Sequence, residues 1–96
     1  MIVRIVKMKF HENHVQDFIT LFWATRDGIL KFNGCSDVKL LQSENDPQTL
    51  TTFSLWESTA HLDHYRYSEF FKKTWMTIKP WMIEKADATS YIEMKA

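Results

Sequence analysis

The sequence predicts an α+β domain of the ferredoxin-like type, with the element order β-α-β-β-α-β. Apolar and polar residues alternate near both ends of the chain, as they do in half-buried strands. Apolar residues recur at helical spacing in two longer segments, and a turn-forming stretch separates two further strand-like segments. Right-handed crossovers then give a four-stranded antiparallel sheet with both helical segments on one face.

The first half of the chain begins with a strand at residues 2–10, IVRIVKMKF. Its side chains alternate between a face with Val6, Met8 and Phe10 and a face with Val3, Ile5, Lys7 and Lys9. A helix is predicted at residues 12–31, where one arc holds Val15, Phe18, Ile19, Phe22 and Ile29. The pair Asn33 and Gly34 is typical of the end of a helix.

The second half begins with two strands, at residues 35–43 and 49–56, which the turn-forming sequence ENDPQ joins into a hairpin. Ser58 caps a short helix at residues 59–66. Ser68 caps a longer helix that runs to residue 84, and Pro80 is expected to kink or interrupt it. Alternation returns at residues 86–94 and predicts the last strand.

One face of this sheet is left without a helix to cover it. The face still carries apolar side chains, namely Val3, Ile5, Phe53 and Leu55. An exposed apolar surface of this kind predicts association. Two sheets packed face to face would form a homodimeric barrel.

Size and composition limit the possible classes of protein. A chain of 96 residues forms one domain, residues 1–96. Twelve basic and twelve acidic residues leave no excess positive charge for nucleic acid. No apolar run approaches the ~18 residues that span a membrane. The N-terminus does not resemble a signal peptide, and the single cysteine, Cys35, fits a reducing cytoplasm.

Several segments together resemble a known family. They are the opening strand IVRIVKMKF, the helix end FNGC at 32–35, the junction FSLWES at 53–58, and the segments LDHYRYSEFF at 62–71 and KADATS at 85–90. With them, the whole chain resembles the antibiotic biosynthesis monooxygenase superfamily of dimeric α+β barrels. That superfamily includes cofactor-independent oxygenases of anthrones and quinols, heme-degrading oxygenases, and many proteins without an assigned role.

The heme-degrading branch uses an Asn on the first strand, a Trp at the end of the third and a His on the second long helix. Only the tryptophan has a counterpart here, Trp56. The first-strand position is Val6 and the helix position is Trp75, so the axial iron ligand is missing. The resemblance therefore favours a protein without heme, and no cofactor is predicted.

Three residues are candidates for catalysis. Trp56 ends a strand and could hold a substrate oxygen with its indole N–H, although a core tryptophan would instead bond a backbone carbonyl. Arg26 lies within the apolar arc of its helix and could clamp an enolate, or else extend to solvent or pair with a carboxylate. His61 could act as a general base near neutral pH, or be a surface histidine without a catalytic role.

Aromatic and apolar residues could line a substrate pocket between the sheet and the helices. The candidates are Phe22, Tyr65, Tyr67, Phe71, Trp75 and Ile78, with Tyr65 as a hydrogen-bond donor. The same helical stripe would also suit a simple core. His61 and His64 could share a face of their helix, but no recognised ligand pattern accompanies them, and no metal site is predicted.

The leading hypothesis is a small homodimeric, cofactor-independent monooxygenase that acts on a quinol, anthrone or polycyclic phenol. Such a reaction needs an apolar aromatic cavity, a base, and donors for a developing oxyanion. The alternative is a barrel that binds a small apolar ligand, or serves in stress or regulation, without catalysis. Heme binding is a third and weaker hypothesis.

Overall fold

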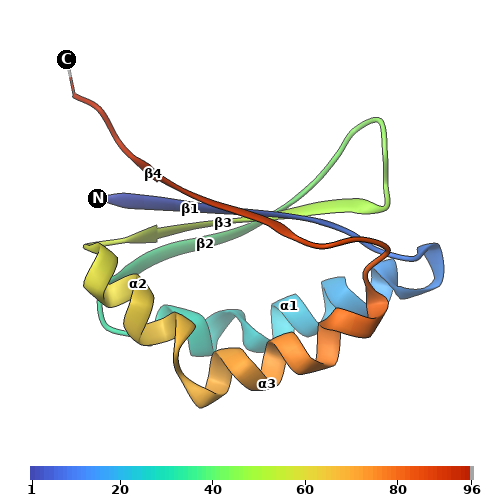
Figure 1. The fold of residues 1–96 in the computed structure, drawn as a ribbon, viewed down its shortest axis with the longest axis horizontal. Coiled ribbons are helices and arrows are strands. Elements are labelled where there is room, and N and C mark those ends of the chain that lie inside the picture. The colour runs from blue at the N-terminus through green and yellow to red at the C-terminus, as the bar shows by residue number, and fades with distance from the viewer. Residues whose placement is uncertain (96) are drawn as a thin grey trace.

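The computed structural model describes residues 1–95 and confirms the predicted α+β architecture (Figure 1). The strands are β1 (Ile2–Lys9), β2 (Cys35–Gln42), β3 (Thr49–Trp56) and β4 (Asp87–Ile92). The α-helices are α1 (Val15–Leu30), α2 (Thr59–Arg66) and α3 (Glu69–Ile78). Two 3-10 turns, η1 (Glu12–His14) and η2 (Lys79–Trp81), precede α1 and follow α3.

The strands form one antiparallel sheet in the order β2-β3-β1-β4. Figure 1 shows α1, α2 and α3 together on one face of this sheet, which leaves the other face without a helix. In the register of β1 and β3, Val3 pairs with Leu55 and Ile5 pairs with Phe53. The apolar residues that the alternation assigned to the uncovered face therefore lie opposite one another on it.

The two serine caps form as the sequence predicts. The Ser58 hydroxyl accepts a hydrogen bond from the backbone N–H of His61 at the start of α2. The Ser68 hydroxyl accepts one from Phe71 at the start of α3. Each cap satisfies an N–H group that the first turn of a helix leaves without a partner.

The helix and strand boundaries differ from the prediction at several ends. The helix predicted at 12–31 begins only at Val15, because residues 12–14 form a 3-10 turn. The helix predicted to reach residue 84 ends at Ile78, because Pro80 has no backbone N–H and η2 replaces the last turns. The last strand covers residues 87–92 rather than 86–94.

The hydrophobic core lies between the sheet and the helices. Its fully enclosed side chains are Trp56, Phe10 and Leu50. Further buried residues are Met8, Phe18, Phe22, Ile29, Val38, Leu62 and Ile78. No helix within residues 1–95 combines the length and the hydropathy that crossing a bilayer requires.

Gly34 lets the chain turn tightly from α1 into β2. Its φ angle of 87° lies in the left-handed region, which favours glycine. A Cβ at this position would also collide with the imidazole of His61. The absence of a side chain at Gly34 therefore allows α2 to pack closely against the end of α1.

Candidate functional site

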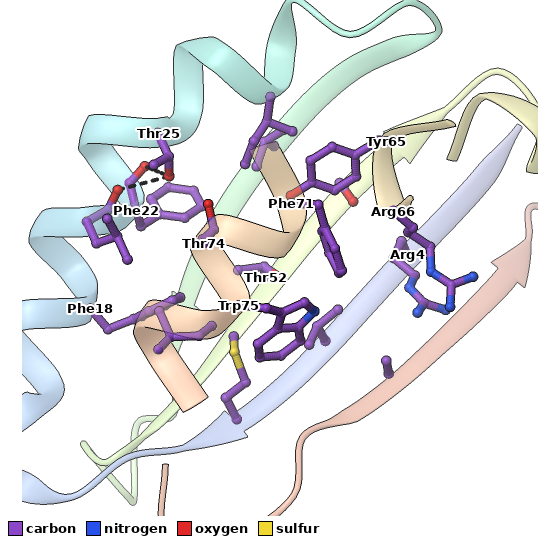
Figure 2. Close-up of a pocket in the computed structure, with 18 of the residues that line it drawn as sticks. Arg4, Phe18, Phe22, Thr25, Thr52, Tyr65, Arg66, Phe71, Thr74 and Trp75 are labelled. Carbon is purple, nitrogen blue, oxygen red and sulfur yellow. Dashed lines mark hydrogen bonds between the residues drawn. The ribbon is translucent and has the colours of Figure 1, made fainter. Parts of the chain in front are cut away.

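A cavity of about 300 Å³ lies between the sheet and the three helices (Figure 2). Its apolar wall comes from all three helices and includes Phe18, Phe22, Leu62, Phe71, Trp75 and Ile78. Polar groups at its surface come from both the sheet and the helices: Arg4, Thr25, Thr52, Ser54, Tyr65, Arg66 and Thr74. A mostly apolar cavity with a few polar groups is the usual form of a small-molecule site.

Five of the six predicted pocket residues line this cavity: Phe22, Tyr65, Phe71, Trp75 and Ile78. Tyr67 does not, and its side chain is 69% exposed. The sequence placed Tyr67 on the apolar arc of a long helix, but it is the C-cap residue of α2 and lies before α3 begins. The helical spacing that joined Tyr67 to Phe71 is therefore broken.

The aromatic wall is a connected series of rings. Tyr65 packs edge to face on Phe71 at 5.1 Å, and Phe71 packs on Trp75 in the same way at 5.9 Å. On its other side, Tyr65 stacks on Trp56 at 5.1 Å. Edge-to-face and offset contacts of this kind fix ring orientations. The cavity wall is therefore tied directly to the core.

Trp56 lies behind the cavity rather than at its surface. Its side chain is completely buried, and its indole N–H donates to the Ser54 hydroxyl oxygen at 2.9 Å. Ser54 lines the cavity and keeps its own hydroxyl hydrogen free to donate. The hydrogen-bond donor that was expected from Trp56 is thus supplied by Ser54, two residues earlier on the same strand.

The other two candidate catalytic residues also lie outside the cavity. The Nδ1 atom of His61 is 2.7 Å from the Ser58 hydroxyl, and its Nε2 atom is 3.9 Å from a Glu57 carboxylate oxygen. Arg26 donates from Nε to the Val38 carbonyl at 2.9 Å, and its Nη2 atom is 3.8 Å from an Asp37 oxygen. Arg26 therefore pairs with a carboxylate, which was one of its alternatives to catalysis, and His61 contacts two neighbours on its own segment.

Four hydroxyl residues that line the cavity, Thr25, Thr52, Ser54 and Thr74, were not among the predicted site residues. Thr25 donates to the Leu21 carbonyl at 2.9 Å and Thr74 donates to the Phe70 carbonyl at 3.0 Å, so both present lone pairs to the cavity. Ser54 presents a donor. A sequence signal existed for Ser54, because it lies between the buried residues Leu50 and Trp56 on the inward face of β3.

Tyr65 is the neutral donor of the site. Figure 2 shows its hydroxyl directed toward the interior of the cavity. Burial raises the pKa of this phenol well above its ordinary value of 10.0. The group therefore stays protonated at physiological pH and acts as a hydrogen-bond donor rather than a base.

Within residues 1–95, the lining of the cavity includes no side chain of the kind that accepts a proton near neutral pH. Among the residues described, neither a carboxylate nor a histidine belongs to its lining. In the same part of the chain, residues 1–95, no three His, Cys, Asp or Glu side chains gather closely enough to hold a metal ion. The charged groups of the lining are two arginines, Arg4 and Arg66.

Comparison with known proteins identifies the family. The model of the antibiotic biosynthesis monooxygenase family matches residues 1–75, and the chain belongs to this family. Among solved structures, a conserved protein from Methanosarcina mazei Go1 is 24% identical, with 98% of this chain and 94% of that chain covered, at a TM-score of 0.90. No significant match was found among curated proteins.

Two further structures have the same fold. One described as an antibiotic biosynthesis monooxygenase is 15% identical, with 99% of this chain and all of that chain covered, at a TM-score of 0.90. SnoaB, a cofactor-independent oxygenase from Streptomyces nogalater, is 9% identical, with 99% and 94% covered, at a TM-score of 0.87. At these identities the likeness extends to the fold alone.

Proposed function

We propose that the chain is a cofactor-independent monooxygenase whose substrate is a small aromatic quinol, anthrone or polycyclic phenol. The observation that carries the proposal is the cavity of about 300 Å³ with its aromatic wall and its inward-facing donors. The family of the chain, and the presence of a cofactor-independent oxygenase among proteins of the same fold, support this assignment.

The proposed substrate lies with its rings against Phe22, Phe71 and Trp75. Tyr65 and Ser54 donate hydrogen bonds to the substrate oxygen, which becomes an oxyanion when the substrate loses a proton. Donors that are already oriented stabilise such a charge without reorganisation during the reaction. Trp56 is a positioning residue, because it holds Tyr65 by stacking and Ser54 by its N–H.

The proposed chemistry is balanced without a cofactor. The methylene carbon of an anthrone loses a proton, and the resulting anion transfers an electron to molecular oxygen. Recombination forms a carbon–oxygen bond. One oxygen atom becomes the new carbonyl and the other leaves as water with both methylene hydrogens. The substrate is oxidised and molecular oxygen is reduced.

The source of the base differs from the one expected from the sequence. His61 and Arg26 have no direct part in this proposal, because neither lines the cavity. The proton instead leaves to water, and the acidity of the substrate increases because its anion is stabilised by donors and by nearby positive charge. We therefore expect only substrates that are intrinsically acidic to react.

Oxygen uptake tests the proposal. Purified protein is mixed with anthrones and hydroquinones in the presence of a metal chelator, and autoxidation is subtracted. We expect chelator-resistant uptake that scales with protein and falls about tenfold or more in Tyr65→Phe and in Ser54→Ala. The matched control is Tyr67→Phe, which removes the same hydroxyl from an exposed ring outside the cavity.

The absence of a base in the lining of the cavity favours a second candidate function, a barrel that binds a small ligand without turnover. Saturable binding of these aromatic compounds with no uptake above background would support this second function and contradict the oxygenase. Equal uptake by wild type and both cavity variants would contradict the roles of Tyr65 and Ser54.

The assembly proposed for the chain is a homodimer that buries the uncovered face of the sheet. Val3, Ile5, Phe53 and Leu55 are only half-buried there, and Tyr91, which pairs with Val3, is 53% exposed. An apolar sheet face of this kind is stabilised by a partner. The cytoplasm remains the proposed location, on the basis of the single free cysteine, Cys35.

A further inference from the structure

Two arginines meet at one end of the cavity. Arg4 lies on the inward face of β1, two residues before Val6, and Arg66 is the last residue of α2. Figure 2 shows their guanidinium groups turned toward the same region, beside the ring of Phe71. Both side chains are half-buried. A strand residue that faces a helix layer is normally apolar, so a charge at position 4 calls for a physical explanation.

Within residues 1–95, only one of the two arginines pairs with a carboxylate. Arg66 is 3.3 Å from an Asp63 oxygen through its Nη1 atom. The structure gives Arg4 no carboxylate partner within residues 1–95, and its Nη1 atom donates to the Ser90 hydroxyl at 3.0 Å. Burial, and then the nearby charge of Arg66, lower the pKa of Arg4. This end of the cavity therefore carries more positive than negative charge.

The unused donors of Arg4 have a suitable geometry for a carboxylate. Its bond to Ser90 occupies one N–H of the guanidinium and leaves the edge formed by Nε and Nη2. That edge carries two parallel N–H groups, which match the two oxygens of a carboxylate. Arg66 adds a second positive charge on the same side.

The approach to the cavity is also positively charged. A wider groove adjoins it and shares Arg66, Phe71, Trp75 and Ala88 with its lining. This groove adds Lys72, Lys79 and Lys85, against Glu84 in its own lining and Glu69, whose carboxylate lies 3.7 Å from the Lys72 amine. The whole chain has a formal charge of zero, whereas the lining of this groove holds more basic than acidic residues. Such a local field attracts anions toward the opening.

We propose that the natural ligand is an aromatic carboxylic acid, whose carboxylate binds between Arg4 and Arg66. The aromatic part then lies in the cavity against Phe71 and Trp75. This inference rests on the proposed function for the aromatic occupant and adds the anionic group, which that function does not require. It explains why a strand position beneath α2 carries an arginine without a carboxylate partner.

Calorimetric titration with 2-naphthoate and 2-naphthamide tests the inference, because the two probes differ mainly in charge. We expect wild type to bind naphthoate at least about tenfold more tightly than the amide, and added salt to weaken only naphthoate. Arg4→Gln and Arg66→Gln should each bring the two affinities close together by weakening naphthoate alone. Lys31→Gln, an exposed charge outside the cavity, should leave the ratio unchanged.

Lysine variants separate the geometry of the guanidinium from its charge, and they also guard against misfolding of the glutamine variants. Arg4→Lys keeps the charge but lacks the planar pair of donors, so naphthoate should bind with intermediate affinity. Circular dichroism establishes that each variant is folded. A naphthyl phosphate that binds more tightly than naphthoate would overturn the choice of carboxylate.

The outcomes distinguish this inference from the proposed function. Equal binding of both probes by wild type would remove the anion site and leave the aromatic cavity intact. Tight naphthoate binding that persists in both arginine variants would place the anion elsewhere. Failure of both probes to bind would overturn the aromatic ligand class as well.

Discussion

The indole of Trp56 and the phenol ring of Tyr65 stack, with centroids 5.1 Å apart and planes inclined by 20°. Trp56 is completely buried at the end of β3, whereas Tyr65 lies on α2 and lines the cavity. The stack therefore joins the rigid core to the cavity wall. Trp56 thereby helps to hold the phenol of Tyr65 in place at the cavity.

Replacing Trp56 should test its place in the core. Trp56→Ala removes a fully buried side chain, and we expect it to lower the free energy of unfolding by about 3–5 kcal/mol. Trp23→Ala removes the same side chain from a site that is 61% exposed, and should change stability by less than about 1 kcal/mol. Urea unfolding followed by circular dichroism measures both. Similar losses in the two variants would contradict the placement of Trp56 in the core.

Gly34 should not tolerate a side chain. Gly34→Ala meets two costs, a left-handed φ angle and a collision with His61. We expect a loss of about 1–2 kcal/mol from the backbone alone, with more from the collision. In the double variant Gly34→Ala/His61→Gly both the ring and the Cβ of His61 are removed and the collision is relieved, so the Gly34→Ala substitution should cost less in that background. Additive effects of the two substitutions in thermal unfolding would show that the His61 side chain does not press on this position.

The buried phenol of Tyr65 predicts a loss of stability at alkaline pH. Its pKa is raised in the folded protein, so the unfolded chain loses this proton first as the pH increases. The contribution is fully present below the ordinary pKa of 10.0 and is lost as the pH rises above it. Tyr65→Phe should therefore lose less stability than wild type as the pH rises from neutral to about 12.

Tyr67→Phe provides the control for this titration, because Tyr67 is exposed. Its alkaline loss of stability should match that of wild type. Cys35 contributes a loss of the same sign, since burial raises the pKa of its thiol as well, and this contribution is common to all three proteins. An identical pH dependence in wild type and Tyr65→Phe would contradict the buried phenol.

The uncovered sheet face predicts a dimer that a single charge disrupts. Ile5→Glu places a carboxylate opposite Phe53 at the centre of that face. We expect wild type to sediment as a dimer and Ile5→Glu to sediment as a monomer, since an unpaired charge is costly to bury at an interface. Trp23→Glu changes an exposed aromatic residue on α1 and should remain dimeric. A monomeric wild type at micromolar concentration would contradict the proposed assembly.

Local signals in the sequence were sufficient for the order of the elements. Alternation identified the first and last strands, the turn sequence ENDPQ marked the hairpin between the other two, and the hydroxyls of Ser58 and Ser68 marked the starts of two helices. These signals depend on neighbouring residues only, and the structure confirms them. The ends were less well predicted, because termination at Ile78 depends on how the segment around Pro80 turns back toward β4.

Contacts between elements were not accessible from the sequence. The helical periodicity placed Arg26 among apolar residues, but could not show that its guanidinium reaches the Val38 carbonyl on β2. The same limitation applies to Trp56, whose indole was expected to bond either a substrate oxygen or a backbone carbonyl and instead bonds Ser54. Tyr67 was assigned to the pocket because its spacing from Phe71 fits the apolar stripe of the second long helix, although Tyr67 lies before that helix begins.

By itself, the sequence determined the strands, the helices, the apolar face without a helix and most of the aromatic wall, because each depends on spacing along the chain. Only the tertiary structure decided which polar groups reach the cavity. Arg4 and Arg66 are far apart in sequence and meet because β1 lies at the centre of the sheet, on the face that the helices cover. The positions of such groups depend on how separate elements pack together. The spacing of residues within one segment does not predict that packing.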